Sequence, residues 1–160
     1  RYSFVPFETL GGPGRAYAHL PARGDIVVFR PVAQPEHDFV KRIIGLPGDR
    51  IQMIAGVLHI NGAPVPREAA PAARVTDPYG ADVQEVPAFR ETLPNGVSYL
   101  TLDRGDTELD NTRVYEVPAG HYFMMGDDRD NSADSRVIGL VGFVPFGNII
   151  GRVDYVLPPP

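Results

Sequence analysis

Residues 38–51 have the sequence DFVKRIIGLPGDRI, and the interpretation of the whole chain starts from this stretch. Its first half is short and rich in β-branched residues, which favours a β-strand over 38–44. Its second half contains LPGD at 46–49, in which Pro47 and Gly48 suit a type II turn. The stretch therefore predicts a strand, a tight turn and a second strand directly after it.

The neighbouring segments predict more short strands. DIVVFR at 25–30 is another β-branched run, and RIQMIAGVLHI at 50–60 is interpreted as two strands that fold back at Ala55-Gly56. Asn61-Gly62 is then a strong hairpin signal. Further strand-like runs lie at 97–102, 114–117, 121–125 and, interrupted by glycines, 139–157.

Two other segments lack this pattern. Residues 1–23, with a flexible GGPG turn at 11–14, are expected to form an irregular lead-in. Residues 64–119 begin rich in Ala and Pro and poor in bulky side chains, which predicts an insertion or small second domain. The catalytic core would then be discontinuous, formed by residues 1–63 and 120–160. We expect a mostly β fold without helices longer than a turn or two.

Composition excludes several classes of function. The formal net charge is -5 and no basic cluster exceeds Lys41-Arg42, which argues against nucleic acid as the main partner. The chain has no cysteine, so disulfides and thiolate zinc sites are excluded. No stretch approaches the roughly 18–20 apolar residues of a membrane span, and no signal peptide is visible.

Lys41 is the only lysine among 15 basic residues. The two-residue period of a strand places it on one face with Phe39 and Ile43. Burial of that face would disfavour the charged ammonium and make the amine a possible general base. The alternative is an edge-strand lysine whose stem covers apolar neighbours while its head reaches water. The residues alone leave both interpretations open.

Candidate partners for such a base are few. The chain has four serines, Ser3, Ser98, Ser132 and Ser135, and no GxSxG motif. The last two lie in a polar loop at 126–136, which could instead be a solvated, self-paired turn; it lacks EF-hand spacing. No histidine lies in a recognisable triad, and His37 and His59 lack paired metal-ligand spacing. We expect neither a metal nor a cofactor.

Three segments together resemble successive boxes of the bacterial type I signal peptidases, which are Ser/Lys dyad proteases. They are RGDIVVFR (23–30), DFVKRIIGLPGDRI (38–51), and MMGDDRDNSADSR followed by GLVGFVP (124–145). Their order and spacing match, including a variable insertion between the second and third boxes, and RYSFVPF resembles the segment before the first. The resemblance implies a mostly β, signal-peptidase-like protease core that carries a small β-rich insertion domain.

The resemblance also implies residue roles. Lys41 would be the general base of the dyad, and Ser132 would hydrogen-bond and orient it without being the nucleophile. Four loop residues would support the site by holding the loop's shape: Asp134, Arg136, Asp127 and Arg129.

The implied substrates are the signal peptides of secreted preproteins, cut at A-x-A-type sites by acyl transfer to serine and then hydrolysis. The peptide would add as a β-strand, beside the cleft-lining residues Val28, Asp38, Phe39 and Val40. The implied location is the bacterial inner membrane, with the catalytic domain against the membrane surface on the periplasmic side.

This chain departs from the family pattern in two places. Position 128 is Asp where the family usually has Asn, which adds a negative charge to the loop. The family's nucleophile lies in an S-M-x-P-T-L-like box, and Ser3, followed by Phe4-Val5-Pro6, does not fit it. We expect that box, preceded by a membrane anchor, upstream of Arg1.

The missing box leaves three hypotheses. The chain is the greater part of an active peptidase, inactive alone because it lacks the nucleophile and the oxyanion hole. Alternatively, it is a non-catalytic homologue that binds signal peptides or membrane partners. The third hypothesis is a self-contained hydrolase that uses Ser132 or Ser135 with Lys41.

Overall fold

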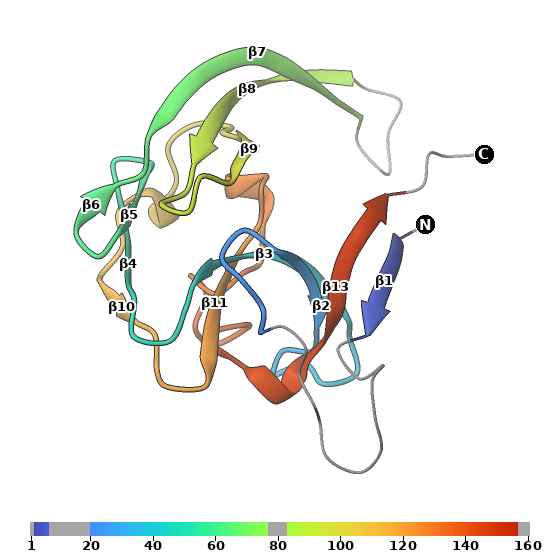
Figure 1. Cartoon of the computed structure of the whole chain (residues 1–160). Helices are drawn as coiled ribbons and strands as arrows, with labels where there is room; N and C mark the ends of the chain where they lie inside the picture. Colours follow the sequence, from blue (N-terminus) through green and yellow to red (C-terminus); the bar gives the residue numbers. More distant parts are fainter. Residues whose placement is uncertain (1, 7–19, 77–82, 157–160) are drawn as a thin grey trace.

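The protein is mostly β, as predicted. The computed structural model describes residues 2–6, 20–76 and 83–156 (Figure 1). Helical structure in these ranges consists of three single-turn 3-10 helices: η1 (Glu108–Asp110), η2 (Arg129–Asn131) and η3 (Phe146–Asn148). None of the described helices is long and apolar enough to cross a membrane.

The largest sheet is antiparallel and has the strand order β1-β13-β2-β3-β11-β12. Its strands are β1 (Tyr2–Pro6), β13 (Ile149–Val156), β2 (Ile26–Phe29), β3 (Phe39–Gly45), β11 (His121–Met125) and β12 (Val144–Pro145). The strand predicted over 38–44 is therefore β3, and it lies inside this sheet.

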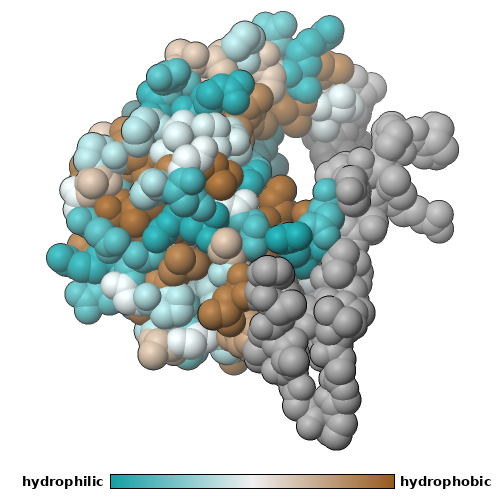
Figure 2. All heavy atoms as spheres, viewed as in Figure 1, coloured by the Kyte–Doolittle hydropathy of each residue, from teal (hydrophilic) through white to brown (hydrophobic). Residues whose placement is uncertain are grey.

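Two smaller sheets complete the fold. One has the order β10-β4-β5-β6, with β10 (Tyr115–Glu116), β4 (Arg50–Ile54), β5 (Val57–Ile60) and β6 (Ala63–Pro64). The other has the order β7-β8-β9, with β7 (Arg67–Thr76), β8 (Val83–Thr92) and β9 (Ser98–Leu102). Figure 1 shows β7 and β8 as a long curved arch, and Figure 2 shows hydrophobic residues beneath that arch.

The predicted turns at Pro47-Gly48 and Ala55-Gly56 are confirmed. Asp49 N–H donates to the carbonyl of Leu46 (3.0 Å) around Gly48, whose φ of 89° is the left-handed conformation that a type II turn requires. Ala55 and Gly56 both have positive φ, 47° and 73°, and connect β4 to β5 as a tight hairpin.

Strands β3 and β11 separate two hydrophobic clusters. Side chains alternate across a strand, so Ile43 packs into one cluster and Ile44 into the other. On β11, Phe123 packs into the cluster of Ile44 and Met124 into the cluster of Ile43. Where β3 and β11 pair with each other, both faces of each strand are buried. This explains why the two strands have nearly continuous apolar sequences.

The expected irregular lead-in over 1–23 is wrong at its start, because Tyr2–Pro6 form β1 and pair with β13. The partner strand begins more than 140 residues later, and no local pattern reports such a pairing. The GGPG turn at 11–14 lies outside the described residues. In the glycine-punctuated segment 139–157 the described strands begin at Val144, because 139–143 contains a turn and a bend.

The segment 64–119 contains two strands of ten residues that its composition did not indicate. Alanine and proline are poor strand formers, yet β7 pairs along nearly its whole length with β8, with an irregularity between Ala70 and Ala73 around Pro71. The division into a core and an insertion stays a prediction. Within that segment, β10 belongs to the sheet of β4 and not to that of β7.

Candidate active site

Lys41 and Ser132 line one cleft of about 230 Å³ although 90 residues separate them in sequence. The strand β3 supplies Lys41, and the loop after β11 supplies Ser132. The cleft is lined by Ile26, Val40, Lys41, Arg42, Gly126, Asp127, Asp128, Asn131 and Ser132. Within the described part of the chain, no group of three His, Asp or Glu side chains is arranged to hold a metal ion.

The side chain of Lys41 is half-buried in an apolar setting. Lys41 pairs with Val27 of β2 and alternates to the same face of β3 as Ile43, as predicted. Its Nζ lies 5.9 Å from the centre of the Phe39 ring. Arg42 points to the opposite face, toward Tyr99 in the cluster that contains Ile44. The two consecutive basic residues of the strand therefore have different surroundings.

The hydroxyl of Ser132 is buried, and among the described residues it has no hydrogen-bond partner. The Ser132–Lys41 hydrogen bond that the resemblance implies is not formed in this structure. Gly126 lies against both side chains: a Cβ at position 126 would be 2.1 Å from Ser132 Oγ and 3.7 Å from Lys41 Cδ. The close approach of Ser132 and Lys41 therefore requires glycine at this position.

An ion pair inside the loop holds its shape. Asp134 accepts hydrogen bonds from the Gly126 N–H (3.0 Å) and from Nε and Nη2 of Arg136 (2.9 and 2.8 Å). Both side chains are 0% exposed. Ser135 is buried too and accepts from the Met124 N–H (2.8 Å), so it does not line the cleft. The loop is therefore self-paired, as the alternative interpretation has it, but it is not a solvated turn, because Arg129, Asp134 and Arg136 are buried.

The other loop residues pair with distant segments. Asp127 accepts two hydrogen bonds from Arg42 (2.9 and 2.7 Å), and the buried Arg129 pairs with Glu91 of β8. The added charge at Asp128 is compensated by Arg104, which donates to that carboxylate from Nη2 (2.8 Å). The sequence did not identify Arg42, Arg104 or Glu91 as loop partners, because each lies at least 24 residues from its partner.

The predicted substrate-binding residues do not all reach the cleft. Val40 lines it, while Val28 pairs with Val40 from β2 and is buried. Asp38 is exposed and pairs with Arg30 (2.8 Å), and the partly buried Phe39 packs against the cluster that contains Ile43. Sequence reasoning did not identify four lining residues: Ile26, Arg42, Gly126 and Asn131.

These features define a mostly β protein whose candidate site combines a half-buried lysine with a buried serine hydroxyl. The family described as signal peptidase, peptidase S26, matches residues 12–157. The chain therefore belongs to the signal peptidase family, peptidase S26.

Named relatives agree with this assignment. Signal peptidase I of Rickettsia typhi (strain ATCC VR-144 / Wilmington) is 43% identical over 97% of this chain and 57% of its own length. Signal peptidase I of Rickettsia prowazekii (strain Madrid E) is 42% identical over 89% of this chain and 54% of its own length. The chain thus spans little more than half the length of these relatives.

A solved structure of a signal peptidase I from Enterococcus faecalis V583 is also similar. It is 24% identical and has a TM-score of 0.47 to this chain. The match covers 84% of this chain and 97% of that one.

Replacing Gly126 with alanine is expected to displace Ser132 from the cleft. The new Cβ would lie 2.5 Å from Ser132 Cβ, so the backbone has to move, with a loss of about 1–3 kcal/mol in the free energy of unfolding. Urea unfolding measures this loss. Gly139→Ala is the control, because a Cβ there meets nothing within 4 Å; equal effects of the two variants would contradict the expected clash.

Proposed function

We propose that the complete protein is a serine endopeptidase that removes signal peptides from secreted preproteins at A-x-A-type sites. The observation that carries the proposal is that Lys41 and Ser132 line one cleft in a chain of the signal peptidase family. The resemblance implies that small side chains of the peptide would enter shallow pockets beside β3.

The proposed reaction uses Lys41 as the general base. The neutral amine accepts the proton of a serine hydroxyl while the serine oxygen forms a bond to the scissile carbonyl carbon. The C–N bond then breaks, and the lysine ammonium gives the proton to the leaving amine. Water hydrolyses the acyl-enzyme by the same proton transfers in reverse order. Ser132 would orient the amine throughout, and Asp127, Arg129, Asp134 and Arg136 would hold the loop that carries it.

The proposed peptide-binding edge is the first half of β3. Residues 39–42 pair with β2 on one side, whereas β11 pairs with β3 only from Arg42 onward. Among the described strands, the second edge of Phe39–Lys41 thus has no partner. An extended peptide that added there would pass beside Lys41 and Val40.

The nucleophile is proposed to lie outside these 160 residues, in a serine box upstream of Arg1, so that the chain alone would not cleave peptides. Family membership also supports a location at the inner membrane, with the catalytic domain on the periplasmic side. Cell fractionation followed by protease accessibility tests that location.

The deciding experiment incubates the complete natural protein, and separately the 160-residue chain, with a preprotein that carries an Ala-x-Ala site. Mass spectrometry should find cleavage after the second alanine with the complete protein only, and none when that alanine is replaced by phenylalanine. Binding without cleavage by the complete protein would indicate the non-catalytic homologue instead. A serine-directed covalent probe that labels Ser132 or Ser135 of the 160-residue chain would indicate a self-contained hydrolase.

A further inference from the structure

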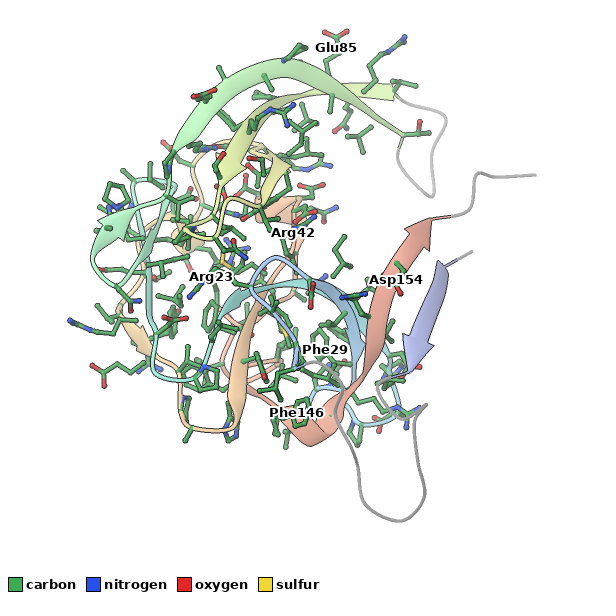
Figure 3. All side chains as sticks on the ribbon, in the orientation of Figure 1. Arg23, Phe29, Arg42, Glu85, Phe146 and Asp154 are labelled. Atoms are coloured by element: carbon green, nitrogen blue, oxygen red, sulfur yellow. The ribbon has the colours of Figure 1, made fainter. Side chains whose placement is uncertain are left out.

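One aromatic ring of the segment 64–119 contacts both halves of the candidate site. Tyr99 lies in β9 and is 7% exposed. The guanidinium of Arg42 stacks on its ring, with 4.2 Å from Cζ to the ring centre. Arg42 follows Lys41 in β3 and donates to the cleft-lining Asp127. Figure 3 shows Arg42 in the space between β3 and the three-stranded sheet.

The hydroxyl of the same ring contacts the Ser132 loop. Tyr99 donates a hydrogen bond to Oε2 of Glu91 (2.9 Å) and accepts one from Nη2 of Arg129 (3.2 Å). Arg129 also donates to both carboxylate oxygens of Glu91. Arg129 is three residues before Ser132 in the loop. The face of Tyr99 therefore contacts the lysine strand, and its hydroxyl contacts the serine loop.

The group is balanced in charge, and its centre is closed to water. Two guanidinium groups face two carboxylates around a phenol. Arg129 and Glu91 are 4% and 1% exposed, whereas the side chain of Asp127 at the edge of the group is 39% exposed. Burial, more than the nearby charge of Glu91, raises the pKa of Tyr99 well above its usual value, although Arg129 opposes this. The phenol thus stays protonated and donates to Glu91 throughout the physiological pH range.

Stability alone is a weak explanation for this arrangement. Removing ionic groups from water opposes the gain from pairing them, so buried ion pairs often contribute little net stability. Their directional hydrogen bonds restrict geometry instead, because a misplaced partner leaves a buried charge unsatisfied.

We propose that Tyr99, through Arg42 and Arg129, is a positioning residue that fixes the strand of Lys41 relative to the loop of Ser132. The sheet β7-β8-β9 is then part of the active site's framework and not an independent appendage. The catalytic meaning of this role rests on the proposed function, whereas the geometric role does not.

Lys41 offers a direct readout, because it is the only lysine of the chain. Reductive ¹³C-methylation labels the Lys41 amine, whose NMR signal can then be followed. The α-amine of the chain is labelled too, and its signal is recognised because it titrates at about pH 8. Tyr99→Phe retains the ring and removes the hydroxyl. We expect the Lys41 signal of the folded variant to shift and broaden at fixed pH, because the loop beside the amine is no longer held in one place.

A matched control separates this effect from the loss of any buried hydroxyl. Thr101 is in the same strand as Tyr99 and is 0% exposed, and its hydroxyl donates to the Phe89 carbonyl (3.4 Å), inside the three-stranded sheet. Thr101→Val removes this buried hydroxyl at similar volume, so it should lower the urea midpoint and leave the Lys41 signal in place. Glu91→Gln, which preserves shape and removes charge, should shift the signal as Tyr99→Phe does.

The activity of the complete protein gives a second readout. Tyr99→Phe should lower kcat about tenfold while KM stays within about twofold, because alignment and not peptide binding is lost. An unchanged Lys41 signal in a folded Tyr99→Phe chain would overturn the proposal, and so would failure of both this variant and Glu91→Gln to fold. If the complete protein cleaves no signal peptide but the Lys41 signal shifts, the positioning role stands and the proposed function fails.

Discussion

Replacing Lys41 with arginine in the complete protein is expected to abolish signal-peptide cleavage at every pH. Arginine keeps the positive charge and most of the stem of lysine but does not lose its proton in proteins. A general base contributes typically about 10²–10⁴-fold to a rate, and the proposed reaction uses no other base, because the cleft-lining Asp127 and Asp128 are paired with arginines. We therefore expect a fall of at least about 10³-fold in kcat, measured by product formation from a preprotein between mildly acidic and strongly alkaline pH.

The same exchange should leave the fold intact. Lys41 is only half-buried, so we expect the free energy of unfolding, measured with urea, to change by less than about 1 kcal/mol. Arg90→Lys, an exposed exchange on β8 at a residue that does not line the cleft, is the activity control. Cleavage by Lys41→Arg close to that of the unmodified protein would show that another group is the base.

Replacing Asp134 with alanine is expected to cause the largest loss of stability in the site loop. The carboxylate accepts from the Gly126 N–H and from the Arg136 backbone and side chain, all buried. Its removal leaves the Arg136 guanidinium, whose Nη1 already has no partner among the described residues, without its counter-ion. Breaking one side of a buried ion pair costs about 3–5 kcal/mol, which urea unfolding measures directly.

Asp154→Ala is a matched control for this loss. Asp154 also pairs with an arginine two residues away, Arg152 (2.7 Å), but that arginine is exposed. Exposed ion pairs contribute only about 0–1 kcal/mol, so this variant should unfold close to the unmodified chain. If Asp134→Ala were no more destabilising than Asp154→Ala, the Asp134–Arg136 pair would not hold the loop.

Much of the fold could be predicted from local sequence. The strands at 39–45 and 121–125 and the turns at Gly48 and Ala55-Gly56 have their signals within a few residues. The first strand was not predicted, although Tyr2, Phe4 and Val5 favour strands, because its partner β13 is distant in sequence. The long arch β7–β8 was not predicted, because β7 is rich in alanine and contains a proline.

In the candidate site, too, the features with a local sequence signal could be predicted and the long-range contacts could not. The lone lysine in an apolar strand, the polar loop with Ser132 and the family membership can all be recognised in contiguous residues, without the fold. The distant groups that hold the site are known only from the folded chain: Arg42 on Asp127, Arg104 on Asp128, and Glu91 with Tyr99 on Arg129. Such pairs form between segments brought together by sheet packing. Since any arginine can pair with any nearby carboxylate, composition and spacing carry no record of the partner chosen.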